Sequence, residues 1–373
     1  MILFVRTADI ALQKLLSVQH IWMASLQKSS MTRSVNSMLK NKIKGALYGF
    51  AVGDALGCTT EFMTEEQIKR IHGVHKNITG GGMLGWERGD VTDDTDLMLC
   101  VGRAYMHKES FLQNCADEFS KWYKSNPRDI GNCCRIVMSA CADKPYKEWM
   151  LYTKNRLLIG HHKDYGNGSL MRALVPAMCG DYESAIAQGR LTHNNALCDS
   201  IIKSYSEYLY DLLNGKTPLI CPGELEPTGM VMNTIVCAHY AVFRYDNFES
   251  ALIHVVNRGG DADTIGAIAG SLAGAYHGYD KIPVRWRNAL HRSTRKELDA
   301  LADFIYAKLM SKTAYWEDSD MAELDADGMQ IIKDNEAIVC SNCKCGFSKA
   351  ALWKRNFCPN CGRPMKENND EID

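Results

Sequence analysis

The sequence predicts a compact, mostly helical domain over residues 39–315, and three observations lead to this fold class. Apolar residues recur at spacings of three and four along most of this range, as expected for α-helices with one buried face. The periodic segments are bounded by Gly, Pro or Asn, as in KSNPRD and LNGKTPL. Candidate strands are few and short, and no repeat of about 20 to 50 residues is evident.

The predicted helices follow one another along the chain, with loops between them. Each places its apolar residues on one face, which indicates packing against a common core. In chain order they are KIKGALYGFAVGDALG (42–57), EEQIKRIHGV (65–74), SFLQNCADEFSKWYKS (110–125), CDSIIKSYSEYLYDLLNG (198–215) and TIVCAHYAVFRY (234–245).

Composition and charge indicate a protein with a large core and no general affinity for polyanions. Of the 373 residues, 46% are hydrophobic and 23% are charged, and the formal net charge is -1. A chain of this length can bury one large domain and a small second one. The near-neutral charge gives no overall attraction to nucleic acid or to an anionic membrane. No apolar run reaches the roughly 20 residues that a membrane-spanning helix needs.

The cysteine content indicates the compartment. Fifteen cysteines, an odd number, show no repeating framework, and Cys133 and Cys134 are adjacent. This usage argues against a secreted disulfide scaffold and favours a reducing environment. We therefore expect a cytoplasmic protein. We also expect that it does not associate with membranes and that it is a monomer.

The N-terminus, residues 1–38, is predicted to be an extension outside the helical domain. The first 44 residues hold seven Lys or Arg against one acid, Asp9, and show a helical apolar spacing. This pattern allows an amphipathic targeting segment. A signal peptide is disfavoured because MILFV precedes the first charge, and the internal Met31 and Met38 leave a start-site extension open as well.

Four aspartates crowd the start of a further predicted helix in GDVTDDTDLMLCVGRAY, residues 89–105. They are Asp90, Asp93, Asp94 and Asp96. A helix start explains one or two of them, because Thr92 or Thr95 can act as N-cap and carboxylates are favoured in the first turn. Four like charges repel one another unless a cation lies between them. This segment alone therefore allows either a cap or a cation site.

A second helix start with acidic residues occurs in VVNRGGDADTIGAIAGSLAGAYHG, where Asp261 and Asp263 precede Thr264. Carboxylate and hydroxyl oxygens suit hard cations such as Mg²⁺ or Mn²⁺ better than zinc. If both helix starts face one cleft, two metal ions could share them; a cap with tight packing is the alternative. One face of this helix is nearly bare and can approach another helix closely, because glycine recurs at Gly266, Gly270 and Gly274.

Six motifs together make the chain resemble the ADP-ribosylglycohydrolases, which include the dinitrogenase-reductase-activating glycohydrolases. They run in family order from about residue 42 to residue 285, and the TDDT and DADT pair is the most specific. The resemblance implies an all-α fold, an orthogonal helical bundle, with a dinuclear Mg²⁺ or Mn²⁺ site. The motifs are GALYGFAVGDALG with the following Glu61, GDVTDDTD, PRDIGN, YGNGSLMRALVPA, LTHNNALCDS and NRGGDADTIGAIAGSLAGAYHG.

The resemblance also implies roles for individual residues. Glu61 falls where some members carry a gating or catalytic glutamate, and Asp129, in PRDIGN, matches a carboxylate that assists opening of the ribose ring. His193 matches a histidine beside the ribose. The implied metal ligands are Thr92, Asp93, Asp94, Asp261, Asp263 and Thr264, of which Asp94 is also assigned to catalysis. The implied phosphate and ribose loop comprises Asn167, Gly168, Ser169, Met171 and Arg172.

Residue chemistry alone leaves simpler interpretations open at that loop. YGNGSLMR is also typical of a Gly-rich turn before a helix, because short glycine motifs are common. Arg172 could equally form a surface salt bridge, and His193 could cap a helix. Free N–H groups in a Gly-rich turn nevertheless suit a diphosphate.

Two functions of different classes are compatible with these features. The first is a metal-dependent hydrolase that removes ADP-ribose from a modified protein side chain, arginine being favoured, or from a small molecule. Metal ions that hold the ribose hydroxyls would orient the sugar and activate a water for attack at C1. The second is a protein that binds ADP-ribose or another nucleotide without turnover. All six metal positions carry competent residues, which favours the enzyme.

The chain after the helical domain differs in composition. Residues 317–336 hold eight acids against one lysine, so that residues 316–336 are predicted to form an acidic linker. Within it, ELDADGMQIIKD has EF-hand-like spacing. Glu323, Gln330 and Asp334 depart from the residues usual at their positions, which disfavours a calcium loop.

Residues 337–366 are predicted to form a small zinc ribbon, followed by a tail at 367–373. Two C-x2-C pairs provide four thiolates for one structural Zn²⁺, and Cys345 is a spare that could replace Cys343. The basic and aromatic residues between the pairs suit a nucleic acid or a protein partner equally. The predicted ligands are Cys340, Cys343, Cys358 and Cys361.

Overall fold

The computed structural model describes residues 36–107, 109–159, 165–216 and 223–311, together with the backbone of short strands between residues 314 and 366. The chain divides into two compact units. One is Lys40–Ser311, and the other combines Met1–Leu39 with Lys312–Asp373. The predicted boundaries at residues 38 and 315 stay predictions, and the possible targeting segment in residues 1–35 lies outside the described residues.

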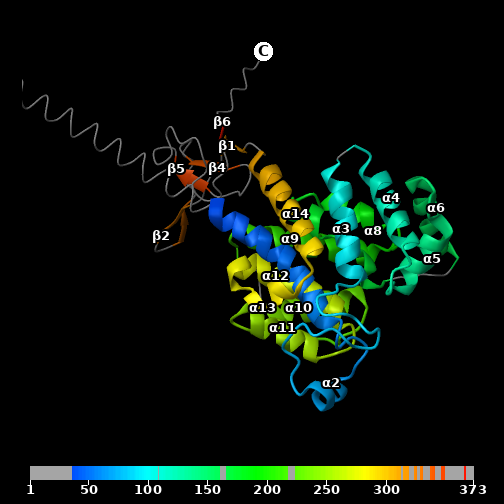
Figure 1. Ribbon diagram of the computed structural model, residues 1–373. Helices are drawn as coiled ribbons and strands as arrows, with labels where there is room; N and C mark the ends of the chain where they lie inside the picture. The colour runs from blue at the N-terminus through cyan, green and yellow to red at the C-terminus, as the bar shows by residue number, and fades with distance from the viewer. Residues whose placement is uncertain are drawn as a thin grey trace, which may run out of the picture. The chain divides into compact units, whose positions relative to one another are not determined.

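Helices make up the larger unit (Figure 1). In its described residues the extended pairings are two isolated bridges, Gly81 with Trp86 and Gly166 with Met230, so the mostly helical prediction for this domain is confirmed. The elements are a helix at residues 36–57, α2 (Glu65–His72), α3 (Asp93–Met106), α4 (Phe111–Lys124), α5 (Asn132–Cys141), α6 (Tyr146–Leu158), η1 (Asn167–Ser169), α7 (Leu174–Met178), α8 (Tyr182–Gly189), α9 (Ala196–Leu213), α10 (Val231–Arg244), α11 (Phe248–Asn257), α12 (Ala262–His277), η2 (Tyr279–Lys281), α13 (Val284–Ala289) and α14 (Arg292–Ser311).

The helix α12 lies at the centre of this unit. Every residue from Ala262 to Ala275 is buried, and the helix packs against α3, α9, α10 and α11. A helix that is apolar or small on all sides is suited to such a position, because no face needs solvent. The start of α12 is therefore held from several directions at once.

The helix at residues 36–57 lies against α12 backbone to backbone. A Cβ atom added to Gly49 would lie 2.1 Å from the carbonyl oxygen of Gly270, and one added to Gly270 would lie 1.9 Å from that of Gly49. The same approach recurs at Gly45 with Gly274, Gly53 with Gly266 and Gly57 with Ala262. We call these four pairs the glycine interface. It provides the close contact that the glycine spacing of α12 predicts.

The glycine interface also brings two chain segments to one place. The helix at residues 36–57 ends four residues before Glu61, and α12 begins one residue after Asp261. Because the last pair joins Gly57 to Ala262 and Asp263, the end of one helix meets the start of the other.

Among the described residues, no helix has the length and apolar character needed to cross a membrane.

The second unit contains short strands. A four-stranded sheet has the order β5-β4-β1-β6, with β1 parallel to β6 and antiparallel to β4, and a separate pair joins β2 to β3. The strands are β1 (Ala314–Asp318), β2 (Glu323–Asp325), β3 (Gly328–Gln330), β4 (Ala337–Cys340), β5 (Gly346–Ser348) and β6 (Met365–Lys366).

Two sequence predictions fall in this unit. The acidic linker at residues 316–336 stays a prediction; β2 and β3 pair within this range, with Leu324 opposite Met329 in the register. Of the predicted zinc ligands, Cys340 ends β4, while Cys343, Cys358 and Cys361 lie outside the described residues, as does Cys345.

Candidate active site

Asp54, in the helix at residues 36–57, organises the start of α3. Its carboxylate is fully buried and accepts the backbone N–H of Thr92 and of Thr95 at 3.1 Å, and also the Thr95 hydroxyl at 2.5 Å. Thr92 is the N-cap, and its hydroxyl accepts the N–H of Asp94 at 3.2 Å. The capping interpretation of this segment is therefore correct for Thr92. Capping also leaves the carboxylates of Asp93 and Asp94 available for other partners.

Asp94 links the two acidic helix starts. Its Oδ2 atom accepts a hydrogen bond from the Thr92 hydroxyl at 3.1 Å and one from the Thr264 hydroxyl of α12 at 3.2 Å. Its Oδ1 atom is buried and has no hydrogen-bond partner in the part of the chain that the structure describes. The starts of α3 and α12 thus meet, as the shared-cleft hypothesis requires.

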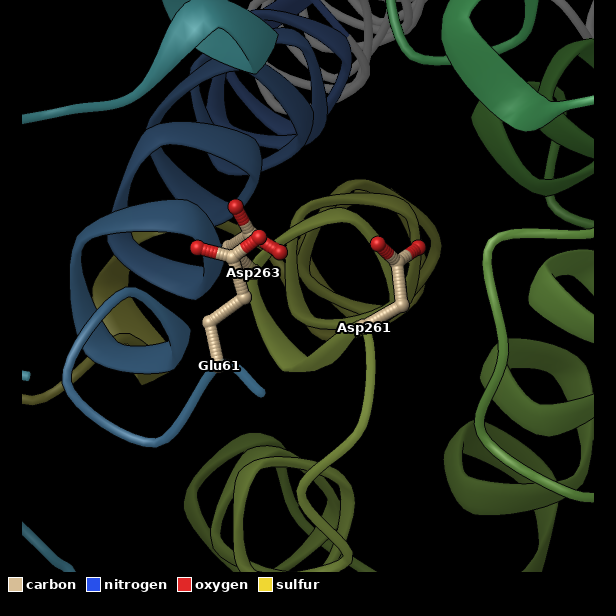
Figure 2. Close-up of side chains that lie close together, drawn as sticks. All are labelled: Glu61, Asp261 and Asp263. Carbon is tan, nitrogen blue, oxygen red and sulfur yellow. The ribbon is translucent and has the colours of Figure 1, made fainter. Parts of the chain in front are cut away.

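Glu61, Asp261 and Asp263 gather at the start of α12 (Figure 2). One oxygen from each lies within 4.8 Å of the others. Glu61 reaches from the loop after the helix at residues 36–57 toward Asp263, as Figure 2 shows. Asp261 is held by Asn167, whose Nδ2 donates to Oδ2 at 2.5 Å. We call these three residues, together with Asp93 and Asp94 at the start of α3, the acidic cluster; three segments that are distant in sequence contribute to it.

The other two aspartates of the first segment have structural partners. Trp122 donates its indole N–H to Asp96 at 3.0 Å. Asp90 pairs with Arg128 and His291 at the surface. The crowding of four aspartates thus combines two residues of the acidic cluster with two that hold neighbouring elements.

Burial and mutual repulsion raise the pKa values of the clustered carboxyls. Burial, followed by the charges of Asp129 and Asp261, raises the pKa of Glu61 to about 9. Burial and then Asp129 raise the pKa of Asp93 to about 8. Burial is also the main cause that raises the pKa values of Asp94 and Asp263 well above the ordinary range. A site with this arrangement holds its full negative charge at neutral pH only beside cations.

The donor set fits hard divalent cations. The clustered ligand atoms are oxygens, which Mg²⁺ and Mn²⁺ prefer. Two buried carboxylate oxygens, Oε2 of Glu61 and Oδ1 of Asp94, lack a partner among the described residues. An unpaired buried charge is costly, and a bound cation removes that cost.

The acidic cluster lies at a cleft of about 920 Å³. The cleft is also lined by the PRDIGN loop, the YGNGS loop and the segment before α12. Of the residues assigned from the sequence, those that line it are Glu61, Asp93, Asp129, Asn167, Gly168, Met171, His193, Asp261, Asp263 and Thr264. Those that lie behind its wall are Thr92, Asp94, Ser169 and Arg172.

The family is decided by comparison with known proteins. A family model described as ADP-ribosylglycohydrolase matches residues 36–217 and 199–317, which include the whole acidic cluster. The chain belongs to the ADP-ribosylglycohydrolase family. It is therefore an enzyme, a hydrolase of this family, and the alternative of a binding protein without turnover is set aside.

Similar proteins agree with this placement. The ADP-ribosyl glycohydrolase of dinitrogen reductase from Rhodospirillum rubrum is 36% identical over 290 residues, which cover 69% of this chain and 94% of the relative. The ADP-ribosylarginine hydrolase Tri1 from Pseudomonas putida (strain GB-1) is 27% identical, over 70% of this chain and 77% of its own length. A solved structure titled ADP-ribosylglycohydrolase-related protein complex matches with a TM-score of 0.63 and 28% identity, covering 74% of this chain and 100% of that chain.

In this ADP-ribosylglycohydrolase, Arg172 holds the cleft wall from behind. It is fully buried and stacks on the Phe119 ring with its guanidinium carbon 4.8 Å from the ring centre. Its Nε donates to the side-chain oxygen of Gln188 at 2.7 Å, and its Nη1 donates to the carbonyl of Gly168 at 2.6 Å. The donors that the resemblance assigned to substrate are thus directed to the protein. Sequence could not decide this, because the motif is the same whichever way the guanidinium turns.

Two residues at the site escaped the sequence analysis. Asp54 positions the start of α3, and its signal was a lone acid within an apolar, Gly-rich helix. Arg135, on α5, is the only lysine or arginine among the described residues that line the cleft. It donates to the Ile130 carbonyl at 2.9 Å through Nη2. No motif included Arg135, because it lies after PRDIGN in a helix of ordinary composition.

Proposed function

We propose that this hydrolase removes ADP-ribose from a modified protein side chain, arginine being favoured, by cleaving the glycosidic bond at ribose C1. The observation that carries the proposal is the meeting of Glu61 with the starts of α3 and α12 at the base of one large cleft. A cleft of about 920 Å³ has room for a dinucleotide-sized ligand.

The site would hold two Mg²⁺ or Mn²⁺ ions. The residues proposed to bind them are Thr92, Asp93, Asp94, Asp261, Asp263 and Thr264. When bound, such ions supply Lewis-acid chemistry, orient the ribose hydroxyls and lower the pKa of water.

The residues of the chain itself perform the remaining steps. Asn167 and Gly168 hold the ligand along the wall formed by η1, and Asn167 also fixes Asp261. Asp129 lies on the cleft wall next to Gly131, whose N–H donates to Asp93 at 3.2 Å. We assign to Asp129 the opening of the ribose ring and proton transfer to the leaving group. Glu61 lines the same cleft, near enough to Asp129 for the charge of Asp129 to raise its pKa.

The preference for arginine is supported by chemistry and by relatives. An arginine-linked guanidinium already carries its proton at neutral pH and can leave as a neutral guanidine, so for this substrate the assistance of Asp129 would lie mainly in opening the ribose ring. One relative acts on dinitrogen reductase, and another is named an ADP-ribosylarginine hydrolase.

We expect hydrolysis of ADP-ribosyl-arginine peptides to exceed that of matched ADP-ribosyl-serine peptides in the presence of Mg²⁺ or Mn²⁺. Asp129→Asn should lower kcat about 100-fold, the scale of lost general acid–base catalysis, and change the Kd for ADP-ribose little. The measurement is release of free ADP-ribose from both peptides, with isothermal calorimetry for binding. A preference for serine, or full activity in Asp129→Asn, contradicts the assignment.

A second expectation concerns Arg135, which we propose contacts the diphosphate because it carries the positive charge on the cleft wall. Arg135→Gln should weaken ADP-ribose binding about 10-fold and leave adenosine binding unchanged, because only the former carries phosphate. Arg190→Gln is the matched control, since Arg190 pairs with Asp199 and does not line the cleft. Equal affinities of Arg135→Gln and wild type for ADP-ribose would refute the contact.

For residues 337–366 we propose one structural Zn²⁺ bound by Cys340, Cys343, Cys358 and Cys361. Their spacing is the support for this module. The module would provide a surface for a protein or nucleic-acid partner of the hydrolase.

A further inference from the structure

We propose that Arg172 and Thr192 form a hydrogen-bond relay that holds His193 in the tautomer with its proton on Nε2. His193 thereby becomes a fixed hydrogen-bond donor to an acceptor oxygen of the ligand in the cleft. The identity of that ligand as ADP-ribose rests on the proposed function, whereas the tautomer does not.

The relay begins at Arg172, which cannot lose its protons. Its Nη2 donates to the Thr192 hydroxyl oxygen at 2.7 Å. Further bonds to Gln188 and Gly168 fix the guanidinium in place, and the side chain has no exposed surface. The Thr192 oxygen is therefore an acceptor at all times.

The next link sets the direction of the bond to His193. The Thr192 hydroxyl lies 2.7 Å from Nδ1 of His193. Since Arg172 already donates to this oxygen, the hydroxyl proton is free to point at Nδ1, which then accepts. The opposite arrangement leaves that proton to the thiol of Cys134, a weak acceptor. Nδ1 thus carries no proton, and in a neutral imidazole the proton is on Nε2.

The other side of the ring faces the ligand cleft. His193 lines the cleft, and Nε2 makes no hydrogen bond to any residue that the structure describes. A Cβ atom added to Gly168 would lie 2.9 Å from Cε1 and 3.3 Å from Nε2 of His193, so only glycine allows the loop to pass this close. The Gly168 carbonyl accepts from Arg172. One cation therefore positions both the ring and the loop beside it.

The imidazole stays neutral in this setting. Burial, together with the positive charges of Arg172 and Arg156, lowers the pKa of His193 to about 3. A neutral ring with Nε2–H donates a hydrogen bond and does not take a proton from water or deliver one to the leaving group. The role of His193 therefore differs from that of Asp129: His193 donates a hydrogen bond, and we assign the proton transfer to Asp129.

The relay is tested with the full chain labelled with ¹⁵N-histidine. Long-range ¹H–¹⁵N spectra at pH 7, assigned with His193→Gln, report which ring nitrogen carries the proton. We expect Nε2–H in wild type and in Thr192→Ser, and a shift toward Nδ1–H or a mixture in Thr192→Val, which removes the donor. Thr153→Val is the matched control, because Thr153 is a buried threonine whose hydroxyl bonds to backbone carbonyls and not to a histidine.

Binding provides an independent measurement. Thr192→Val should weaken ADP-ribose binding about 10-fold, and Thr192→Ser and Thr153→Val should bind as wild type does. An Nδ1–H or doubly protonated His193 in wild type overturns the relay, as does an unchanged tautomer in Thr192→Val. If wild type shows the Nε2–H tautomer yet fails to bind ADP-ribose, the relay stands and the proposed function fails.

Discussion

Asp94→Asn and Asp263→Asn are each expected to lower kcat at least about a thousandfold in the presence of Mg²⁺ or Mn²⁺. Each change removes one negative charge from the acidic cluster while it keeps the shape of the side chain. Asp94 accepts from threonines of both helix starts, and Asp263 lies beside Glu61, so either loss affects the whole cluster. The measurement is single-turnover release of ADP-ribose, with Mn²⁺ binding followed by calorimetry.

Asp96→Asn is the control for this experiment. Asp96 lies in the same helix start, but its carboxylate accepts from Trp122, and asparagine retains an acceptor oxygen there. We expect Asp96→Asn to bind Mn²⁺ and to turn over as wild type does. Unfolding curves for all three variants show whether the fold is kept. Wild-type activity in both Asp94→Asn and Asp263→Asn at saturating metal would mean that the cluster is not the catalytic centre.

Gly270→Ala is expected to lower the free energy of unfolding by about 3 kcal/mol. Alanine in a helix is normally favoured over glycine by about 1 kcal/mol. Here the added Cβ would lie 1.9 Å from the Gly49 carbonyl oxygen, so the two helices must separate by about 1 Å. That overpacking outweighs the gain in helix propensity because the obstacle is backbone, which no rotamer change relieves.

Urea unfolding of Gly270→Ala is compared with that of Gly131→Ala. An added Cβ at Gly131 meets nothing within 4 Å, and its φ of -57° suits alanine, so this variant should lose at most about 1 kcal/mol, because alanine is a poorer N-cap than glycine. Equal midpoints for Gly270→Ala and wild type would show that the glycine interface can open without cost.

The sequence was sufficient to predict the helical fold class, several of the helices and the two acidic helix starts, because these follow from local patterns. Apolar periodicity indicates where helices form. An unusual density of acids at two helix starts marks Asp93, Asp94, Asp261 and Asp263 as candidates for a shared site. The glycine spacing of α12 also indicated a close neighbour. The neighbouring helix at residues 36–57 carries glycines at the same spacing of four, within GALYGFAVGDALG. These are Gly45, Gly49, Gly53 and Gly57.

The direction of individual side chains was beyond reach of the sequence. Arg172 stands in a loop motif whether its guanidinium turns to the ligand or to the core, and its environment comes from α4 and α8, which are distant in sequence. Arg135 became a cleft residue only because α5 packs beside the YGNGS loop. Such positions depend on tertiary packing, which a motif does not encode.

In the glycine interface, a substitution that enlarges one residue cannot be compensated by a smaller residue opposite it. In most cores a larger residue on one side can be balanced by a smaller one opposite. Here, at three of the four pairs, both sides already carry the smallest residue, so a clash has no second-site remedy within the pair. Suppressors of Gly270→Ala should therefore map outside these two helices or be true revertants. For the same reason, anyone rebuilding this acidic cluster in another helical scaffold must transplant both helices as one piece.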